Sequence, residues 1–454
     1  MITGLITTLA ACVDPEARPE KSEALPYEST VTTPGIPAIP LTEPAPAEDL
    51  DPADNAVSFR LEAAPLSTLD DGVPTESYAY NGQIPGPTLR AKVGDTVTVE
   101  LNNGLGTATT LHWHGLGVPN LMDGVTWLQN PIAAGEGFTY SFTVTAPGTY
   151  WYHPHVDVDQ QVDRGLYGMF IVEDPGDPTP DRELLLVFDT RDEAGAGDGH
   201  TAPDPARQVW TINGLSTPGL TLTAGERHRV RVLNAANLGY LKLRWPGMRQ
   251  IAGDQGLLGA LQEPEAVVLA PGDRAEFEWI AEQDFLVETE IYTASGGEAL
   301  GDTLALLPVT VTGDPSDTPG LDWPFAGSRA ETEDPSTELL FAFSGGAASE
   351  DWMINGEVYP DVSVSTLALG EVAVIELRNL SATEHPFHLH GHRFRVLSID
   401  GEVPAASGWE DTINVGIRQA IRLELVADNP GDWMAHCHLL AHEEGGMMTV
   451  LRVE

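Results

Sequence analysis

The chain is poor in cysteine, in basic residues and in long apolar runs. Its two cysteines, Cys12 and Cys437, stand far apart in unlike surroundings, which excludes a disulfide framework. Lys and Arg number 23 against 68 Asp and Glu, and the resulting net charge of −45 disfavours nucleic acid and anionic membrane surfaces as partners. No apolar run approaches the ~20 residues that a membrane-spanning helix needs. We interpret the acid excess as a heavily solvated surface. The alternative is that its negative electrostatic field attracts metal cations as substrates.

The first 55 residues read as a leader and a linker. Leu9-Ala10-Ala11-Cys12 follows a short apolar stretch and resembles a bacterial lipoprotein box, in which the cysteine is acylated after cleavage, although no Lys or Arg precedes the stretch. Residues 14–55 hold nine prolines and ten acids against two basic residues, a composition that favours an extended tether. We therefore expect an exported protein, in the bacterial periplasm or at the cell surface, that is attached to the membrane through a lipid on Cys12.

The rest of the chain is an internal triplication. Asn81-Gly82, Asn213-Gly214 and Asn355-Gly356 each open a stretch that continues into an alternating strand, at intervals of 132 and 142 residues. A second alternating strand follows in each copy, at residues 138–144, 275–280 and 420–426. Alternation of this kind places one face of each strand against a core. We predict an all-β protein of three consecutive Greek-key β-sandwich domains, over residues 56–178, 179–318 and 335–454.

Histidines gather in short clusters within this repeat. A random arrangement of 13 histidines would give roughly 0.4 His-x-His pairs in a chain of this length, and five are present. Two clusters in the first copy match two in the third, and the second copy has neither. The matched residues are His112, His114, His153 and His155 in the first copy, and His388, His390, His436 and His438 in the third. Two matched halves predict one polynuclear metal site between the first and third domains, with the second domain as a spacer.

The third copy alone carries four further candidate ligands. They are His385, Cys437, His442 and Met447, and the first copy has Thr109, Pro154, Asp159 and Arg164 in their places. Two imidazoles, one thiolate and a methionine match the trigonal arrangement with a weak axial ligand that is typical of blue copper electron-transfer sites, whereas zinc prefers a closed tetrahedron. Neighbouring side chains of an extended segment point in opposite directions. Cys437 would therefore face one site and its two flanking histidines the other, and the short segment would join the two sites.

The clusters resemble the four signatures of the multicopper oxidases, the family of laccases, ascorbate oxidase and bacterial metal oxidases. The matching segments are His112-Trp113-His114-Gly115, Trp151-Tyr152-His153-Pro154-His155, His385-Pro386-Phe387-His388-Leu389-His390-Gly391 and His436-Cys437-His438-Leu439-Leu440-Ala441-His442-Glu443. The resemblance extends from about residue 56 to the end of the chain. It implies three cupredoxin domains and four copper ions, one of type 1, one of type 2 and a type 3 pair.

The resemblance also implies a role for each residue, position by position. The type 1 ligands would be His385, Cys437, His442 and Met447. The type 2 ligands would be His112 and His388, and the type 3 ligands His114, His153, His155, His390, His436 and His438. Glu443 and Asp123 resemble the proton-relay carboxylates of the family, the alternatives being a surface Glu and a turn-stabilising Asp. His200, His228 and His392 match no ligand position and are predicted to be structural.

By this resemblance the protein couples four one-electron oxidations to the reduction of O2 to two waters. In laccase-like members the reductant is a phenol or an aromatic amine that reaches a type 1 histidine, here His442 or His385, beside the acidic Glu384. Members that oxidise cuprous ion carry a methionine-rich insertion, and this chain has only eight scattered methionines. We therefore favour a laccase-like activity, with a metal oxidase acting on Cu(I), Fe(II) or Mn(II) as the alternative.

Two other classes fit the sequence less well. A copper-free scaffold of the same fold would have lost ligands, but every ligand position is filled here. A copper nitrite reductase has two domains and no paired His-x-His set. The expected partners are therefore O2 and a small-molecule or metal-ion reductant.

Overall fold

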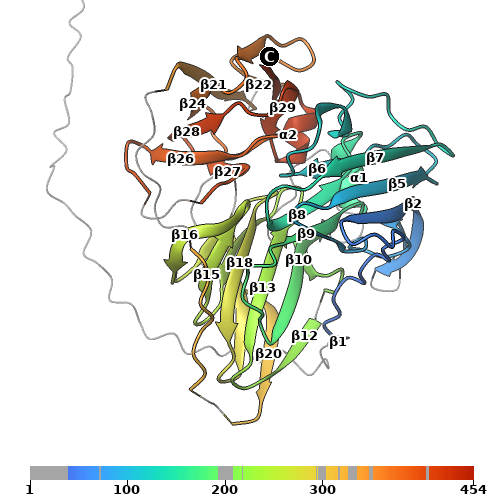
Figure 1. Cartoon of the computed structure of the whole chain (residues 1–454), viewed down its shortest axis with the longest axis vertical. Helices are drawn as coiled ribbons and strands as arrows, with labels where there is room; N and C mark the ends of the chain where they lie inside the picture. Colours follow the sequence, from blue (N-terminus) through green and yellow to red (C-terminus); the bar gives the residue numbers. More distant parts are fainter. Residues whose placement is uncertain are drawn as a thin grey trace, which may run out of the picture. The chain divides into compact units, whose positions relative to one another are not determined.

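The computed structural model describes residues 39–70, 73–192, 208–216, 218–292, 294, 303–314, 317–325, 335–346, 351–404 and 408–454. Cys12, most of the predicted linker and His200 lie outside the described residues. The described part is almost entirely β-structure, arranged as six sheets that form three sandwiches (Figure 1). None of the helices in this part has the length and apolar character that a membrane span requires.

The first sandwich combines two four-stranded sheets around an aromatic core. One sheet has the order β3 (Val73–Tyr80), β2 (Ala56–Asp70), β5 (Thr96–Asn103) and β7 (Gly137–Thr143). The other has the order β4 (Leu89–Lys92), β9 (Gly168–Glu173), β8 (Gly148–His153) and β6 (His112–His114). Trp113 is completely buried between them and packs edge-on against Tyr140 and Phe170.

The second sandwich consists of two six-stranded sheets. One has the order β1 (Ile39–Pro40), β12 (Pro218–Thr223), β20 (Thr303–Thr312), β19 (Phe285–Tyr292), β14 (Tyr240–Arg244) and β17 (Val267–Leu269). The other has the order β11 (Gln208–Ile212), β10 (Arg182–Asp192), β13 (Arg227–Asn234), β18 (Arg274–Ile280), β15 (Arg249–Gly253) and β16 (Gly256–Gln262). Strand β1 comes from the stretch expected to be linker, and Leu41 just after it packs against this core.

The third sandwich consists of two five-stranded sheets. One has the order β22 (Trp352–Ile354), β21 (Thr337–Gly345), β24 (Val372–Asn379), β28 (Ala420–Val426) and β26 (Phe394–Ile399). The other has the order β23 (Val364–Leu367), β30 (Met448–Val453), β29 (Gly431–Cys437), β25 (His385–Leu389) and β27 (Thr412–Val415). The sandwiches share one pattern, because β5, β13 and β24 each pair in parallel with an earlier strand and antiparallel with a later one. The predicted all-β fold of three consecutive sandwiches is confirmed.

The three Asn-Gly turns have the same structure, which explains their repetition. Asn81, Asn213 and Asn355 have φ values of 53°, 51° and 56°, in the left-handed region that asparagine tolerates better than most residues. Each side chain also joins two backbone groups of a neighbouring strand. In the second copy, for example, Asn213 accepts from the Val187 N–H and donates to the Leu185 carbonyl, both at 2.8 Å. Each asparagine therefore adopts the left-handed turn and also anchors that turn to the neighbouring strand.

Two short helices follow corresponding histidine clusters. Helix α1 (Val158–Asp163) comes after the His-Pro-His segment of the first sandwich, and α2 (Leu440–Glu444) after the His-Cys-His segment of the third. The two helices contact each other (Figure 1). The 3-10 helix η1 (Asn120–Met122) precedes Asp123. The first and third sandwiches thus meet through equivalent elements, as the matched clusters predict.

Candidate metal centre

Equivalent strand pairs present the histidines of the two halves. In the first sandwich His112 of β6 lies opposite His153 of β8. In the third sandwich His388 of β25 lies opposite His436 of β29. Each His-x-His segment lies in or at the end of one of these largely buried strands, and its two imidazole rings contact each other. The repeat therefore produces two like arrays of imidazoles.

The two arrays interleave across the boundary between the sandwiches. The ring of His112 stacks on that of His390 with a centroid separation of 3.8 Å, and the ring of His114 stacks on that of His388 at 3.6 Å. Each pair joins one sandwich to the other, and the two pairs are related by exchanging the repeats. All eight matched histidines are buried, the most exposed being His155 at 7%. They form one compact group, which we call the histidine cluster.

The histidine cluster has the donor atoms that metal ions require. Nε2 of His112, His153 and His388, and Nδ1 of His114, are buried without a hydrogen-bond partner among the described residues. Unpaired buried nitrogens are costly, and a metal bound among several such nitrogens would account for them. Three sets of these histidines have ligand atoms within 4.8 Å of one another. The sets are His112 with His388 and His390, His112 with His114 and His153, and His155 with His390 and His436.

Burial keeps most of these imidazoles neutral, which is the form that binds metal. Desolvation lowers the pKa of His155 to about 3 and that of His388 to about 4. It also lowers the pKa values of His114 and His153 well below the ordinary range. A metal ion that binds at the histidine cluster would therefore not have to displace a charging proton from these rings.

A second group lies beside the cluster and consists of His385, Cys437 and His442; we call it the cysteine group. Sγ of Cys437 lies 3.4 Å from Nδ1 of His385 and 3.6 Å from Nδ1 of His442, and the two nitrogens are 3.2 Å apart. Such a triangle of two imidazoles and one thiolate suits trigonal copper. Burial raises the pKa of the Cys437 thiol, so metal binding there releases a proton.

Met447 lies next to the cysteine group. It is completely buried, its carbonyl accepts from the Cys437 N–H at 3.1 Å and its own N–H donates to the His442 carbonyl at 2.9 Å. Cys437 ends strand β29, and its neighbours His436 and His438 belong to the histidine cluster. The extended geometry covers His436 and Cys437, and one tripeptide connects the two groups.

The two histidines of the cysteine group differ in their access to solvent. His385 is fully buried, and its Nε2 is 2.7 Å from Oγ of Ser381. His442 retains 8% of its surface, and Trp352 stacks on its ring with a centroid separation of 3.6 Å. Glu384 does not face an open pocket, because it is only 4% exposed and accepts hydrogen bonds from Tyr292 and Asn414. His442 is therefore the more accessible of the two.

The two carboxylates expected to relay protons both touch the histidine cluster. Oδ2 of Asp123 accepts from Nδ1 of His390 at 2.9 Å, and the Asp123 carbonyl lies 2.8 Å from Nδ1 of His112. Oε2 of Glu443 lies 3.0 Å from Nδ1 of His436, and Oε1 lies 3.4 Å from Nε2 of His155. Both acids are buried, so Glu443 is not a surface residue, while Asp123 also ends the 3-10 helix η1 with its N–H at the Asn120 carbonyl.

Asp411 is a neighbour of the histidine cluster that the sequence interpretation missed. Its carbonyl lies 2.9 Å from Nδ1 of His388, and Oδ1 lies 3.1 Å from Nε2 of His114. Burial alone would raise the pKa of Asp411, but the paired Arg274 holds it well below its usual range. The signal that could have found it is the repeat, since Asp123 makes the equivalent carbonyl contact in the first sandwich. The two acids follow their histidine clusters by different numbers of residues, so the sequence alone does not reveal this correspondence.

The remaining described histidines lie in structural surroundings. His392 lies between the His390 carbonyl and the Asn429 N–H and packs edge-on against Trp433. His228 is buried in the second sandwich and packs near Trp279. Both positions fit the predicted structural roles.

Comparisons with known proteins agree with this geometry. Two sequence models described as multicopper oxidase match residues 64–177 and 332–454. Multicopper oxidase MmcO of Mycobacterium tuberculosis (strain ATCC 25618 / H37Rv) is 31% identical over 84% of this chain and 84% of its own length. A multicopper oxidase from Campylobacter jejuni, described as a metallo-oxidase, aligns with a TM-score of 0.81 and 26% identity over 92% of this chain and 96% of its own. A laccase from Pediococcus acidilactici Pa5930 aligns with a TM-score of 0.81 and 25% identity over 92% and 94%.

Proposed function

Because the chain belongs to the multicopper oxidase family, an oxidoreductase family that uses O2 and binds four copper ions, we propose that it is a laccase-like oxidase of phenols and aromatic amines. The observation that carries the proposal is the junction at Cys437, where one tripeptide joins the cysteine group to the histidine cluster. The balanced reaction takes one electron and one proton from each of four phenols. One O2 receives all four electrons and protons and becomes two waters.

We propose the following ligand assignment. The type 1 copper is held by His385, Cys437, His442 and Met447. The type 2 copper is held by His112 and His388. The type 3 pair is held by His114, His153, His155, His390, His436 and His438. The unpaired buried nitrogens and the sulfur–nitrogen triangle support this assignment. When bound, copper supplies one-electron redox chemistry between the reductant and O2.

The residues around the copper sites would have separate tasks. Ser381 fixes the ring of His385 by accepting its Nε2–H, which leaves Nδ1 directed at Cys437. His442 is the solvent side of the cysteine group and the expected point of electron entry. Asp123 and Glu443 contact imidazoles of the histidine cluster and are placed to pass protons to reduced oxygen.

The surroundings of His442 support an aromatic reductant over a metal ion. The indole of Trp352 lies against its ring, and organic rings pack well beside such a surface. Glu384, the nearby acid, has its carboxylate engaged by Tyr292 and Asn414. Among the described residues, the candidate metal ligands that come together here are His385, Cys437 and His442, with no carboxylate in the set. The alternative remains a metal oxidase, as the Campylobacter jejuni relative is described.

Oxygen uptake by the copper-loaded protein tests the proposal. A methoxyphenol, ferrous ion and cuprous ion are compared at the same salt concentration and pH. We expect faster uptake with the methoxyphenol, and faster uptake with either ion would replace the laccase-like activity by a metal oxidase.

We further propose export and lipid attachment through Cys12, supported by Leu9-Ala10-Ala11-Cys12 and the acidic, proline-rich stretch after it. In a bacterial host, incorporation of a labelled fatty acid into the wild-type protein and not into Cys12→Ala is the expected result. Labelling of both, or of neither, would contradict the attachment.

A further inference from the structure

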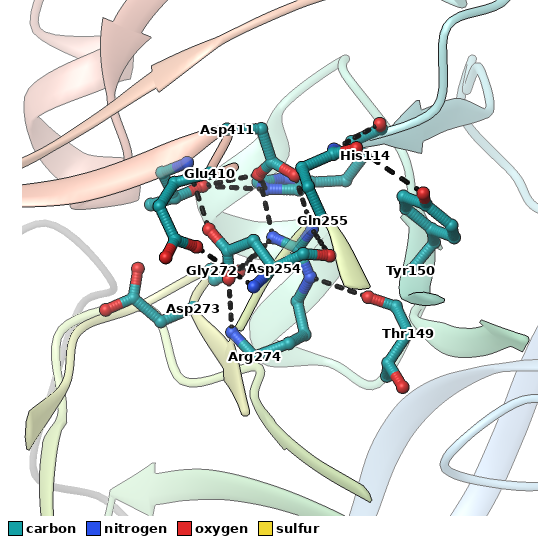
Figure 2. Close-up of polar contacts among 12 residues, drawn as sticks. His114, Thr149, Tyr150, Asp254, Gln255, Gly272, Asp273, Arg274, Glu410 and Asp411 are labelled. Atoms are coloured by element: carbon teal, nitrogen blue, oxygen red, sulfur yellow. Dashed lines mark hydrogen bonds and ion pairs between the residues drawn. The ribbon is translucent and has the colours of Figure 1, made fainter. Parts of the chain in front are cut away.

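Arg274, the first residue of β18 in the second sandwich, is completely buried and uses every N–H of its guanidinium group (Figure 2). Two N–H groups are donated to the carboxylate of Asp411, one to Oδ1 at 2.7 Å and the other to Oδ2. The other three go to the carbonyls of Thr149 at 3.0 Å, Gly272 at 3.0 Å and Asp254 at 3.1 Å. With all five donors engaged, the guanidinium group has a single orientation.

These contacts tie the three sandwiches together at one point. Thr149 belongs to the first sandwich and Asp411 to the third, so Arg274 bridges both from the second. Gln255, also from the second, donates to Oδ2 of Asp411 and to the Gly115 carbonyl, each at 2.6 Å. Gly115 has a φ of +86°, and a Cβ there would lie 2.5 Å from Asp411. The chain after His114 is therefore packed directly against the Asp411–Arg274 pair.

The pair acts on the ring of His114. Nε2 of His114 lies 3.1 Å from Oδ1 of Asp411 and 3.0 Å from Oγ1 of Thr412, and its Nδ1 has no partner among the described residues. His112 and His388 have the reverse arrangement, with Nδ1 at a backbone carbonyl and Nε2 without a partner. A carboxylate that accepts the Nε2–H of His114 selects the tautomer whose lone pair is on Nδ1.

Asp123, which corresponds to Asp411 in the repeat, has no such clamp. Each residue places its carbonyl at a histidine of its own sandwich and its carboxylate at a histidine of the other. Oδ1 of Asp123, however, has no hydrogen-bond partner among the described residues, whereas both oxygens of Asp411 are bound by Arg274. The two equivalent acids thus differ in their support. Asp123 contacts the imidazoles of His390 and, at 3.3 Å from Oδ1, of His112, whereas Asp411 is held by a guanidinium group as well.

We propose that Arg274 is a positioning residue of the histidine cluster: by clamping Asp411 it fixes the tautomer and ring orientation of His114, with Nδ1 directed at the metal. The second domain, which supplies no ligand and was predicted to be a spacer, thereby shapes the copper site of the other two. This inference rests on the proposed ligand role of His114.

A control variant separates this role from the general cost of replacing a buried arginine. Arg229 is also a buried arginine of the second sandwich, and it bonds Glu276 and Asp177 at 2.7 Å each. Neither acid contacts the histidine cluster in any hydrogen bond or ion pair of the described residues. Lysine at either position keeps the positive charge but has three donors in place of five. Arg229→Lys should therefore show the cost of replacing a buried, ion-paired arginine of the second sandwich without the effect on His114.

The experiment compares copper-loaded wild-type protein, Arg274→Lys, Asp411→Asn and Arg229→Lys. Copper per chain, the blue type 1 absorption, the type 2 paramagnetic resonance spectrum and copper loss to a chelator are measured, together with the midpoint of thermal unfolding. We expect Arg274→Lys to keep the blue absorption and to weaken retention of the cluster copper by about ten- to a hundredfold. Because His114 is a proposed type 3 ligand, we also expect a paramagnetic signal in addition to that of type 2, since a type 3 pair that loses one ion is no longer magnetically coupled. Asp411→Asn should give the same pattern, and it replaces Arg274→Lys as the test of the inference if Arg274→Lys does not fold.

Wild-type spectra and copper retention in the soluble variants of Arg274 and Asp411 would overturn the inference. An equal change in Arg229→Lys would also overturn it, since the effect would then follow from stability alone. Failure of the proposed laccase-like activity would give a different result from failure of this inference. It would appear as slow phenol oxidation by wild-type protein that holds its full copper.

Discussion

The indole of Trp352 stacks on the imidazole of His442, with ring centroids 3.6 Å apart and an angle of 26° between the planes. The same indole meets His385 edge-on at 5.5 Å, so one side chain shields both histidines of the cysteine group. An apolar cover of this kind excludes water from a redox site and raises its reduction potential, because water favours the more highly charged oxidised ion.

Replacing Trp352 should therefore lower the type 1 potential. For Trp352→Ala we expect a decrease of about 60 mV, equivalent to a tenfold change in the equilibrium constant of a one-electron couple. Redox titration of the blue absorption measures it. Trp352→Phe keeps an aromatic ring on His442 and should lie close to wild type; equal potentials for all three proteins would remove the shielding role.

Cys437→Ser should abolish the blue absorption and the oxidase activity while the fold is kept. The hydroxyl of serine cannot supply the thiolate, and it is small enough to occupy the same buried position at the end of β29. Absorption and oxygen uptake are measured beside the circular dichroism spectrum. Full activity of this variant with a phenol would refute the assignment of the cysteine group.

Glu443→Gln should slow the reduction of O2 more than the reduction of the type 1 copper. The carboxylate lies 3.0 Å from His436 in the histidine cluster and outside the cysteine group, and loss of an acid–base group costs about a hundredfold or more in rate. Stopped-flow kinetics separates the two half-reactions. Equal slowing of both, or of neither, would argue against a proton-relay role.

Asp189 should make stability fall as the pH rises from about 4 to 7. Burial raises its pKa to about 7, although Tyr167 donates to it at 2.6 Å. Over that range the folded protein keeps a proton that the unfolded chain has lost, so the free energy of unfolding decreases with pH, by about 4 kcal/mol in total. Asp189→Asn removes this dependence, and urea unfolding of both proteins at several pH values measures it. Parallel pH profiles would contradict the raised pKa.

Asn213→Ala should destabilise the second sandwich by about 3 kcal/mol, since it removes two buried hydrogen bonds and places alanine at a φ of 51°. Asn213→Gly tolerates the turn and should cost less. Asn81→Ala loses equivalent bonds at an exposed turn and should also cost less. Thermal unfolding ranks the three variants, and a larger loss at Asn81 than at Asn213 would contradict the role of burial.

The sequence by itself determined the repeat and the inventory of candidate ligands. Alternating strands after Asn-Gly turns specify three like sandwiches, because the alternation is a local property of each strand and the left-handed turn is a local property of asparagine and glycine. The spacing of His436, Cys437 and His438 likewise specifies that one extended segment serves two sites. These features require no knowledge of which distant residues meet.

Only the tertiary structure decided which residues surround the ligands. Arg274 reaches Asp411 across 137 positions of the chain, and Trp352 of β22 stacks on His442 of α2. A buried arginine has no periodic signature in a sequence, and its partner is chosen by the packing of one domain against another. The exposure of His442 rather than His385 is decided in the same way, since it depends on how Trp352 and Ser381 pack around the two rings.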